Sequence, residues 1–202
     1  MTALQSRNLG LRPLADVWAE MQRFTDTRTG ATPDELWFVE HPPIFTLGMN
    51  ADASHLVDPG DIPVLQIDRG GQVTYHGPGQ LVVYTLIDIR RRKLTVRSLV
   101  ETLETAVIDT VAPYGVIAYG RRDAPGVYVG DAKLAAVGLR VRRHCAYHGL
   151  ALNVRMDLEP YQRINPCGFE KLEITQLSAL CSVNSLSDVR RDLEWQFRQK
   201  LA

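Results

Sequence analysis

Along four stretches of the chain, apolar residues recur at intervals of three and four, which is the spacing of one face of an α-helix. The stretch 95–114 is the clearest, and Gly115 follows it where a left-handed residue commonly ends a helix. In the last stretch, Ser187 is the expected N-cap and Asp188 lies in the positive first turn. We therefore predict helices over residues 11–29, 95–114, 173–181 and 187–201.

Short apolar runs bounded by glycine, proline or polar residues are typical of β-strands. We predict strands over residues 35–40, 44–48, 62–68, 81–88, 116–119, 126–129, 132–141 and 146–154. Gly130-Asp131 predicts a hairpin between two of them, although this turn signal is weaker than Asn-Gly. The polar segment 50–60 and the proline-rich segment 157–169 are expected to be loops. This order of elements predicts an α+β fold, a single domain over residues 1–202 with a mixed β-sheet flanked by helices.

The composition is that of an ordinary globular chain of 202 residues, with 45% hydrophobic and 23% charged residues. Lys and Arg together balance Asp and Glu at 23 each, so no overall charge favours a nucleic acid or a membrane surface as partner. No apolar run approaches the roughly 20 residues that cross a bilayer, and the N-terminus lacks the apolar segment of a secretory signal. Three cysteines, an odd number, argue against a disulfide framework, and we expect a cytoplasmic protein.

The most distinctive stretch of the sequence is Arg69-Gly-Gly-Gln-Val-Thr-Tyr-His-Gly-Pro-Gly-Gln80, which lies between two predicted strands. Its glycines indicate close approach of the backbone or positive φ angles, and they leave N–H groups free to face a ligand. A long hairpin loop would also account for the glycines. It would not explain why Arg69, Thr74, Tyr75 and His76 are gathered in the same place.

Cys167 and Lys133 are the strongest candidates for chemistry outside that stretch. Cys167 lies in the loop sequence Asn165-Pro-Cys-Gly168, and it is either a nucleophile or a structural cysteine, as expected for Cys181 on its apolar helix. Lys133 precedes small residues that leave room for a ligand, and its charge can stabilise a thiolate; the alternative is an exposed lysine at a strand end. A joint role requires the two side chains to be close in space, which the sequence does not show.

Histidines provide two further candidates. His76 is a candidate general acid/base or orienting group, since the pKa of histidine ordinarily lies near neutrality. The segment His144-Cys145-Ala-Tyr-His148 holds metal-type ligands, but only three of them, whereas structural zinc sites use four in recognisable spacing. We therefore expect no metal site.

Three separated motifs, in order along the chain, are similar to those of a known family. They are the stretch Arg69–Gln80, residues 126–143 followed by His148-Gly-Leu-Ala-Leu-Asn-Val154, and Ile164-Asn-Pro-Cys-Gly168. Together they resemble the lipoyl(octanoyl) transferases, also known as lipoate-protein ligase B, and the resemblance covers residues 41–177. It implies the fold of biotin and lipoate protein ligases and an acyltransferase that needs no cofactor.

The resemblance also implies roles for individual residues. Cys167 and Lys133 would form a catalytic dyad, with His76 shaping the site. The segments that contact the acyl substrate in the family correspond to Arg69, Gly70, Gly71, Gln72, Val73, Thr74, Tyr75 and His76, to Ala136, Val137 and Gly138, and to Gly149, Leu150 and Ala151. Small and aliphatic residues suit an octanoyl chain, which offers only methylenes to bind, although the same residues would also suit ordinary sheet packing.

The implied reaction moves octanoyl from octanoyl-acyl carrier protein to Cys167 as a thioester, and then to a lysine of a lipoyl domain. The implied acceptors are the lipoyl domains of 2-oxoacid dehydrogenases and the glycine cleavage H protein, in the first step of endogenous protein lipoylation by a monomeric enzyme. The basic cluster Arg90–Lys93 is expected to be a solvated strand end, with docking of the acidic carrier protein as the alternative.

Three other functions fit part of this pattern. A lipoate or octanoate ligase would activate the free acid with ATP and would not need a cysteine nucleophile, so Cys167 argues against it. An amidotransferase that moves octanoyl between lipoyl-bearing proteins would also use a cysteine, and it stays open. A non-catalytic module that binds carrier or lipoyl domains is disfavoured because Cys167, Lys133 and His76 are all intact.

Overall fold

A mixed seven-stranded sheet forms the centre of the computed structural model, which describes residues 4–170, 172–183 and 185–201. Its strand order is β1-β2-β6-β10-β9-β8-β7, and β1 pairs with β2 in parallel while all other neighbours are antiparallel. The strands are β1 Leu4–Leu11, β2 Asp34–Glu40, β6 Gln80–Asp88, β7 Tyr119–Gly120, β8 Gly126–Val129, β9 Ala132–Arg142 and β10 Cys145–Asn153.

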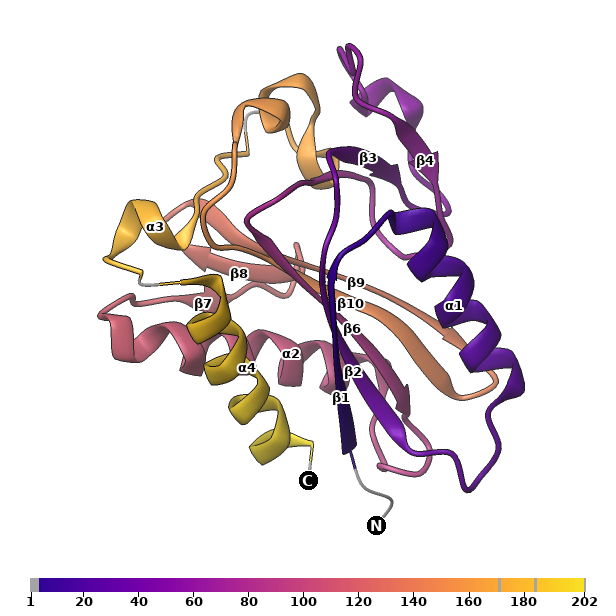
Figure 1. Cartoon of the computed structure of the whole chain (residues 1–202). Coiled ribbons are helices and arrows are strands. Elements are labelled where there is room, and N and C mark those ends of the chain that lie inside the picture. Colours follow the sequence, from indigo (N-terminus) through magenta and orange to yellow (C-terminus); the bar gives the residue numbers. More distant parts are fainter. Residues whose placement is uncertain (1–3, 171, 184, 202) are drawn as a thin grey trace.

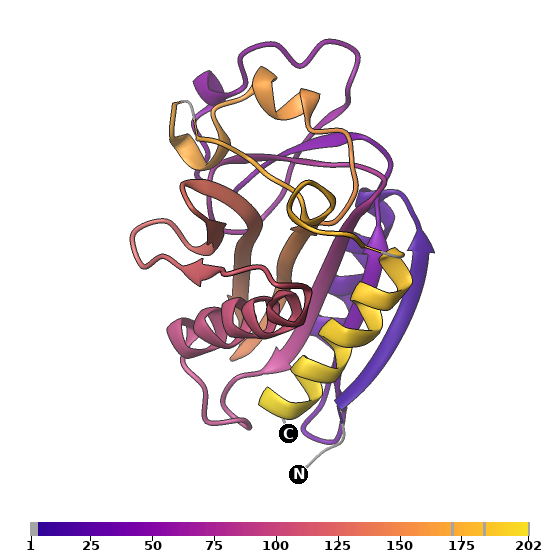
Figure 2. The same cartoon turned by 90° about the vertical axis from the view of Figure 1, so that its left-hand side faces the viewer.

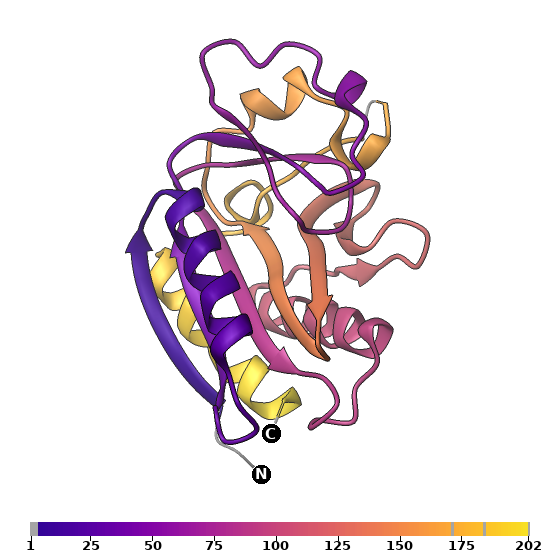
Figure 3. The same cartoon turned by 90° about the vertical axis from the view of Figure 1, so that its right-hand side faces the viewer.

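Helices cover both faces of this sheet. Figures 1 and 2 show α2 and α4 across one face, and Figure 3 shows α1 on the opposite face. The helices are α1 Leu14–Thr27, α2 Val96–Val111, the single turn α3 Leu177–Leu180 and α4 Leu186–Lys200, and the 3₁₀ turns are η1 Ala53–His55, η2 Ala112–Tyr114, η3 Glu159–Arg163 and η4 Pro166–Gly168. None of the described helices is both long and apolar enough to cross a membrane.

Strand β6 shows how the sequence builds the two layers. Because side chains alternate along a strand, its continuous apolar run divides between the two faces of the sheet. The core beneath α2 and α4 receives Leu81, Val83 and Ile87. The core beneath α1 receives Val82, Tyr84 and Leu86.

A second sheet of three short strands stands at one end of the large one (Figure 1). Its order is β4-β3-β5, and its strands are β3 Ile44–Leu47, β4 Val64–Gln66 and β5 Val73–His76. Its own apolar cluster includes Phe45, Val73 and Tyr75 together with Tyr161 and Ile164 from the long loop after β10. The glycine-rich stretch therefore runs from the small sheet to the first residue of β6.

The predicted α+β fold with a mixed sheet flanked by helices is confirmed. The start of α2 follows from its capping residues, because the Ser98 amide donates to Thr95 Oγ1 at 3.0 Å and the Thr95 amide donates to Ser98 Oγ at 2.9 Å. Gly115 ends this region with φ +81°, as predicted. The hairpin of β8 and β9 closes at Gly130, which has φ +56°.

Two predictions about the chain ends were wrong. Residues 4–11 form strand β1, which was not predicted because its apolar residues do not alternate regularly with polar ones. Pairing with β2, and not an intrinsic pattern, orders this edge strand. Helix α4 is capped by Ser185, whose hydroxyl accepts a hydrogen bond from the Asp188 amide at 3.1 Å, so the N-cap expected at Ser187 lies two residues too late.

Two further segments differ from the prediction. The helix expected over residues 173–181 is only the turn Leu177–Leu180, because Ile174 forms a parallel bridge with Lys133 of β9. The glycine-rich stretch is not loop throughout, since residues 73–76 form β5. In both cases pairing with a distant strand overrides the local pattern.

The basic cluster Arg90–Lys93 is not simply a solvated strand end. Its two middle arginines, Arg91 and Arg92, bind the fully buried carboxylate of Asp34 at 2.6 and 2.5 Å. Only the first and last residues of the cluster are exposed. Half of the cluster therefore has a structural role that the sequence pattern did not show.

Candidate active site

The structure brings Cys167 and Lys133 together, with Lys133 Nζ 3.0 Å from Cys167 Sγ. Cys167 lies in the turn η4 and has φ +58°, a left-handed conformation that is uncommon for a residue with a side chain. Lys133 is the second residue of β9 and is only 3% exposed. The fold therefore confines a lysine amine beside the sulfur of a loop cysteine.

The surroundings of Lys133 keep its amine charged and in place. Its Nζ also donates to Pro125 O at 3.2 Å and lies 5.1 Å from the centroid of the Tyr128 ring. Gly126 leaves space for the side chain, since a Cβ there would lie 3.1 Å from Lys133 Cε. Burial opposes the positive charge, but Cys167 and Tyr128 together outweigh burial and raise the pKa of Lys133 above its ordinary value.

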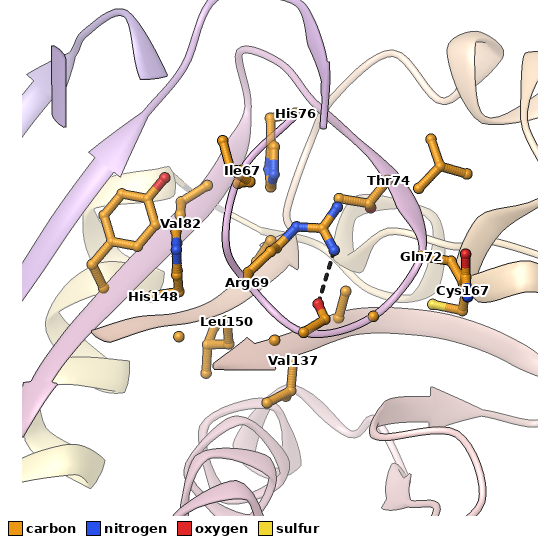
Figure 4. Close-up of a pocket in the computed structure, with 18 residues that line it drawn as sticks. Ile67, Arg69, Gln72, Thr74, His76, Val82, Val137, His148, Leu150 and Cys167 are labelled. Atoms are coloured by element: carbon orange, nitrogen blue, oxygen red, sulfur yellow. Dashed lines mark hydrogen bonds between the residues drawn. The ribbon is translucent and has the colours of Figure 1, made fainter. Parts of the chain in front are cut away.

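Small residues of β9 and β10 form the floor of a pocket that includes Cys167. Ala136 pairs with Ala151 and Gly138 pairs with Gly149, so these four residues face the same side of the sheet. A pocket of about 540 Å³, its open mouth included, lies over them (Figure 4). Any larger side chain at these positions would fill the space that the floor leaves open.

Val137 and Leu150 line the same pocket in a different way. Alternation along β9 and β10 turns their side chains toward the core beneath α2 and α4. They therefore contribute backbone to the floor of the pocket, while their side chains hold the floor against the helices.

The glycine-rich stretch forms the roof of the pocket. The Gly70 amide donates to Leu139 O of β9 at 3.0 Å, which fixes the roof to the sheet. A Cβ at Gly138 would lie 3.1 Å from Gly70 O, and a Cβ at Gly48 would lie 1.9 Å from Gly71 O. Glycine is required at Gly48 because the backbone of the roof passes so close, and at Gly138 a side chain would push the roof outward.

Arg69 brings a positive charge into the pocket (Figure 4). Its Nη2 donates to Thr46 O and Thr46 Oγ1 at 2.7 and 2.8 Å, its Nε donates to Thr46 Oγ1 at 3.2 Å, and its Nη1 donates to Gly70 O at 3.0 Å. All of these acceptors are uncharged, and no carboxylate among the described residues pairs with the guanidinium. Burial lowers the pKa of Arg69 to about 10, so the group is charged at neutral pH.

His76 is a neutral imidazole on the pocket wall. Its Nδ1–H donates to Gln80 Oε1 at 2.7 Å, and the Thr46 hydroxyl donates to its Nε2 at 3.4 Å. Burial, and secondarily the nearby His41, lower the pKa of His76 to about 3. With both nitrogens occupied and no charge at neutral pH, His76 is better suited to orienting its neighbours than to proton transfer.

Most of the predicted binding residues line this pocket. They are Arg69 to Thr74, His76, Ala136 to Gly138 and Gly149 to Ala151, with Cys167 beside them. Tyr75 is not among the lining residues, because its ring packs against Phe45 and Tyr161 at centroid distances of 5.5 and 5.7 Å. Lys133 instead borders a smaller adjoining cavity that also contacts Cys167.

Several residues of the site were not singled out from the sequence. Ile67, Val82 and Tyr84 also line the pocket, and the Tyr84 hydroxyl donates to His41 Nε2 at 2.7 Å. In the sequence Val82 and Tyr84 read as ordinary residues of a buried strand, so no local signal marks them. Only the pairing of β6 with β10 places them at the edge of the pocket floor.

The histidine pair considered for metal binding is not arranged as a metal site. His148 lines the pocket and is hydrogen bonded to Asp68 at 2.8 Å. Within the described ranges, no group of three or more His, Cys, Asp or Glu side chains is placed to hold a metal ion. The absence of a metal stays a prediction.

Comparison with known proteins identifies the family. The lipoyl protein ligase A/B catalytic domain family matches residues 13–198. An octanoyltransferase of Shewanella amazonensis is 54% identical over 198 residues, which are 98% of this chain and 92% of that relative. This chain belongs to the octanoyltransferase family. A second octanoyltransferase, from Aeromonas hydrophila, is 56% identical over 193 residues, covering 91% of this chain and 82% of the relative. The predicted family, and the prediction that the protein is an enzyme, are confirmed.

Solved structures confirm the fold of this octanoyltransferase. A bipartite lipoate protein ligase from Thermoplasma acidophilum superposes with a TM-score of 0.82 at 18% identity, over 100% of this chain and 84% of that one. A biotin protein ligase from Aquifex aeolicus superposes with a TM-score of 0.59 at 10% identity, over 100% of this chain and 69% of that one. The predicted fold of biotin and lipoate protein ligases is therefore correct, and identities this low show the fold alone.

Proposed function

We propose that this octanoyltransferase moves an octanoyl group from octanoyl-acyl carrier protein to a lysine of a lipoyl domain, through a thioester on Cys167. The observation that carries the proposal is the 3.0 Å contact between Lys133 Nζ and Cys167 Sγ, beside a pocket floored by glycine and alanine. Membership of the octanoyltransferase family supports octanoyl as the transferred group. The reaction would be the first step of endogenous protein lipoylation.

In the first half-reaction, Cys167 is the nucleophile. An ammonium group beside a cysteine favours the thiolate, which is its reactive form. The thiolate attacks the carbonyl carbon of the donor thioester, a new carbon–sulfur bond forms, and the bond to the carrier sulfur breaks. The departing carrier thiolate takes a proton from Lys133 and leaves as a thiol.

In the second half-reaction, the now neutral Lys133 is the base. The amine of the acceptor lysine attacks the enzyme thioester, a carbon–nitrogen bond forms, and the bond to Cys167 breaks. Lys133 accepts the proton that the amine loses, which restores the ammonium and the thiolate. Conversion of a thioester to an amide is downhill, so the transfer has a direction without ATP.

The charge of Arg69 supports the same mechanism. Each attack produces a tetrahedral intermediate with a negative oxygen, and a fixed positive group in a buried site stabilises such an oxygen strongly. Arg69 is buried, is charged at neutral pH, and is held by Thr46 and the roof. We infer that it compensates negative charge on Cys167 or on the intermediate.

The pocket would hold the octanoyl chain. Each methylene taken out of water contributes about 0.8 kcal/mol, so the floor of Ala136, Gly138, Gly149 and Ala151 suits a chain without polar groups. We propose that Arg69 to His76, Ala136 to Gly138 and Gly149 to Ala151 contact the substrate, with Tyr75 acting from behind the roof by packing.

The finer identity of the partners is also a proposal. We infer that the acceptors are the lipoyl domains of 2-oxoacid dehydrogenases and the glycine cleavage H protein, and that the enzyme works as a cytoplasmic monomer with residues 1–202 as one catalytic domain. A related fold was solved in a study of a lipoate protein ligase and its E2 lipoyl domain, which supports an acceptor of this kind. No cofactor enters the proposed chemistry.

Intact-mass spectrometry with octanoyl-acyl carrier protein, in the absence of ATP, tests the proposal. We expect the enzyme to gain the mass of one octanoyl group, and the gain to be lost in Cys167→Ser and slowed in Lys133→Ala. Cys181→Ser is the matched control, because Cys181 is a second half-buried free thiol that does not line the pocket.

Two other results would assign a different reaction. If no adduct forms and a lipoyl domain is labelled only when octanoate and ATP are supplied, the enzyme is a ligase and the thioester route is wrong. If the adduct forms from an octanoylated lipoyl domain but not from the carrier protein, the enzyme is an amidotransferase.

A further inference from the structure

Strand β10 contains a left-handed residue in its middle, since His148 has φ +62°. In a regular strand His148 would share a face with Leu150 and Leu152, which pack beneath α2 and α4. Its imidazole instead lines the pocket and stacks on the ring of Tyr147, with centroids 5.1 Å apart. The left-handed backbone thus places two consecutive side chains of β10 on the same face of the sheet.

The imidazole of His148 is held in one orientation. Its Nε2–H donates to Asp68 Oδ1 at 2.8 Å, and its side chain is 3% exposed. Asp68 is fixed in turn, because Trp18 Nε1 of α1 donates to it at 2.8 Å and the Tyr147 hydroxyl also donates to it. Asp68 directly precedes Arg69, so this hydrogen-bond network joins helix α1, strand β10 and the roof of the pocket.

This fixed ring lies at the end of the pocket remote from the reactive sulfur. Lys133, which contacts Cys167, is near the start of β9, whereas His148 pairs with Leu139 toward the other end of that strand. Ala136, which lines the pocket together with Cys167, lies three residues before Leu139. Three residues of extended strand correspond to about 10 Å, which is close to the length of an extended octanoyl chain. Figure 4 agrees, with Cys167 on one side of Arg69 and His148 on the other. The Tyr84 ring stands next to the imidazole at a centroid distance of 6.1 Å and closes the same end.

We propose that the imidazole of His148, clamped by Asp68, is the end wall that limits the length of the acyl chain this enzyme accepts. The inference rests on the proposed function, because it assumes that the acyl chain lies in this pocket with its carbonyl at Cys167. A chain longer than octanoyl would have to displace a ring that is buried, stacked on Tyr147 and bonded to a carboxylate. His148 is then a specificity-determining residue, and Asp68 is a positioning residue.

The substitution His148→Asn tests the wall. Asparagine tolerates a left-handed backbone and retains a short polar side chain, so the strand geometry is kept while the ring is removed. The measurement is the ratio of kcat/KM for decanoyl- and octanoyl-acyl carrier protein. Two further buried methylenes at about 0.8 kcal/mol each correspond to a factor of about 15, so we expect the ratio to rise about 15-fold.

Two further variants distinguish a specific effect of the His148 ring on chain length from a general loss of packing around the pocket. Asp68→Asn keeps the ring but removes the carboxylate that clamps it, and it should raise the same ratio by a smaller factor. Tyr114→Phe is the matched control, because it also removes a hydrogen bond from a tyrosine hydroxyl to an aspartate, Asp192, and neither residue lines the pocket. The ratio in this control should equal that of the wild type.

A ratio within about twofold of wild type in folded His148→Asn and Asp68→Asn would overturn the proposal. If thermal melting shows that His148→Asn does not fold, Asp68→Asn alone decides. A binding experiment distinguishes this outcome from failure of the proposed function. Calorimetry measures the affinities of Cys167→Ser for free octanoate and free decanoate, with and without the additional substitution His148→Asn. The comparison tests whether His148 limits chain length without requiring acyl transfer. An equal ratio of decanoate to octanoate affinity in Cys167→Ser and in the double variant would also overturn the proposed role of His148.

Discussion

Two buried sites that contain arginine differ in whether the buried charge is paired with an opposite charge. At the start of β2, the fully buried carboxylate of Asp34 accepts hydrogen bonds from Arg28, Arg91 and Arg92 at 2.7, 2.6 and 2.5 Å, and from the Asp88 amide at 2.8 Å. In the pocket, Arg69 is 8% exposed and, among the described residues, donates only to the uncharged oxygens of Thr46 and Gly70.

Under the proposed mechanism, this difference separates a structural charge at Asp34 from a functional charge at Arg69. Removing a charge from water is costly, and a counter-ion within the fold offsets the cost. Around Asp34 the fold supplies counter-ions in three arginines. Burial favours the protonated form of Asp34, but its hydrogen bonds outweigh burial and lower its pKa. Around Arg69 the described residues supply none, and burial lowers its pKa to about 10. In the proposed mechanism, an anion of the reaction completes this site and offsets the cost.

The largest effect on stability is expected for Asp34→Asn. It leaves three guanidinium groups facing one another without a negative charge, and we expect the free energy of unfolding to fall by about 3 to 5 kcal/mol. Urea denaturation measures the loss, while the transfer rate per folded molecule should not change. Glu159→Gln is the control, because its pair with Arg163 is solvent-exposed, so its loss should lower the free energy of unfolding far less. Equal losses in both variants would contradict the role of burial.

For Arg69→Met we expect the reverse: slower acyl transfer without a loss of stability. Octanoylation of Cys167 should slow by about 100-fold, because a fixed positive charge near the developing oxyanion is lost. The free energy of unfolding should stay equal or rise, since an unpaired buried charge has been removed. Stopped incubations analysed by intact mass give the rate. Arg69→Lys keeps a charge without the planar fork that Thr46 accepts, so it should recover part of the activity. A large loss of stability with normal chemistry would reverse the assignment of the two sites.

As the pH falls, the stability contributed by the buried histidines at the pocket, His41 and His76, should be lost before the stability contributed by Asp34. Burial lowers the pKa of His41 to about 4 and that of His76 to about 3, so the folded protein favours the neutral forms. Their contribution to stability is complete above the unfolded pKa of 6.5 and is lost as the pH falls toward these values. From about pH 7 to about pH 5, His41 alone should account for a loss of about 2 kcal/mol.

The variant His41→Gln tests the source of that slope. Glutamine can still bond to Arg12 O and the Tyr84 hydroxyl, but it does not titrate. The free energy of unfolding, measured with urea at both pH values, should therefore depend less on pH than in the wild type. An unchanged slope would mean that other groups control acid stability.

The smallest effect is expected for Arg90→Ala combined with Lys93→Ala. These are the exposed ends of the basic cluster whose middle residues bind Asp34. As solvated charges they should change the KM for the carrier protein by less than about twofold. A larger change that disappears at high salt would restore the alternative that this cluster docks the acidic carrier.

The sequence predicted what depends on local patterns. Helical spacing placed α2, and Thr95 and Gly115 mark its ends in the structure as capping chemistry requires. The glycine-rich stretch and the loop with Cys167 were recognisable because their residue types are unusual for strands or helices. Local signals therefore sufficed for the long helices, whereas the positions of most lining residues were predicted from the family resemblance.

What the sequence did not predict depends on contacts between distant segments. The 3.0 Å distance between Lys133 and Cys167 results from the pairing of β9 with its neighbours and from the path of the loop after β10. Asp68 and His148 were missed as a pair because they meet only through the roof and β10, 80 positions apart. A left-handed residue inside a strand has no sequence signal when that residue is not glycine.

The bridge between Ile174 and Lys133 has a consequence for the newly made chain. The Lys133 amide donates to Glu173 O at 2.8 Å, and its carbonyl accepts from the Thr175 amide at 3.0 Å. β9 leaves the ribosome before this segment, so an unfinished chain carries the lysine without its clamp and without Cys167. The pair of Lys133 and Cys167 proposed for catalysis thus assembles only after residues 173–175 have been made, and in a fragment truncated before residue 173 we expect the lysine to lack this alignment.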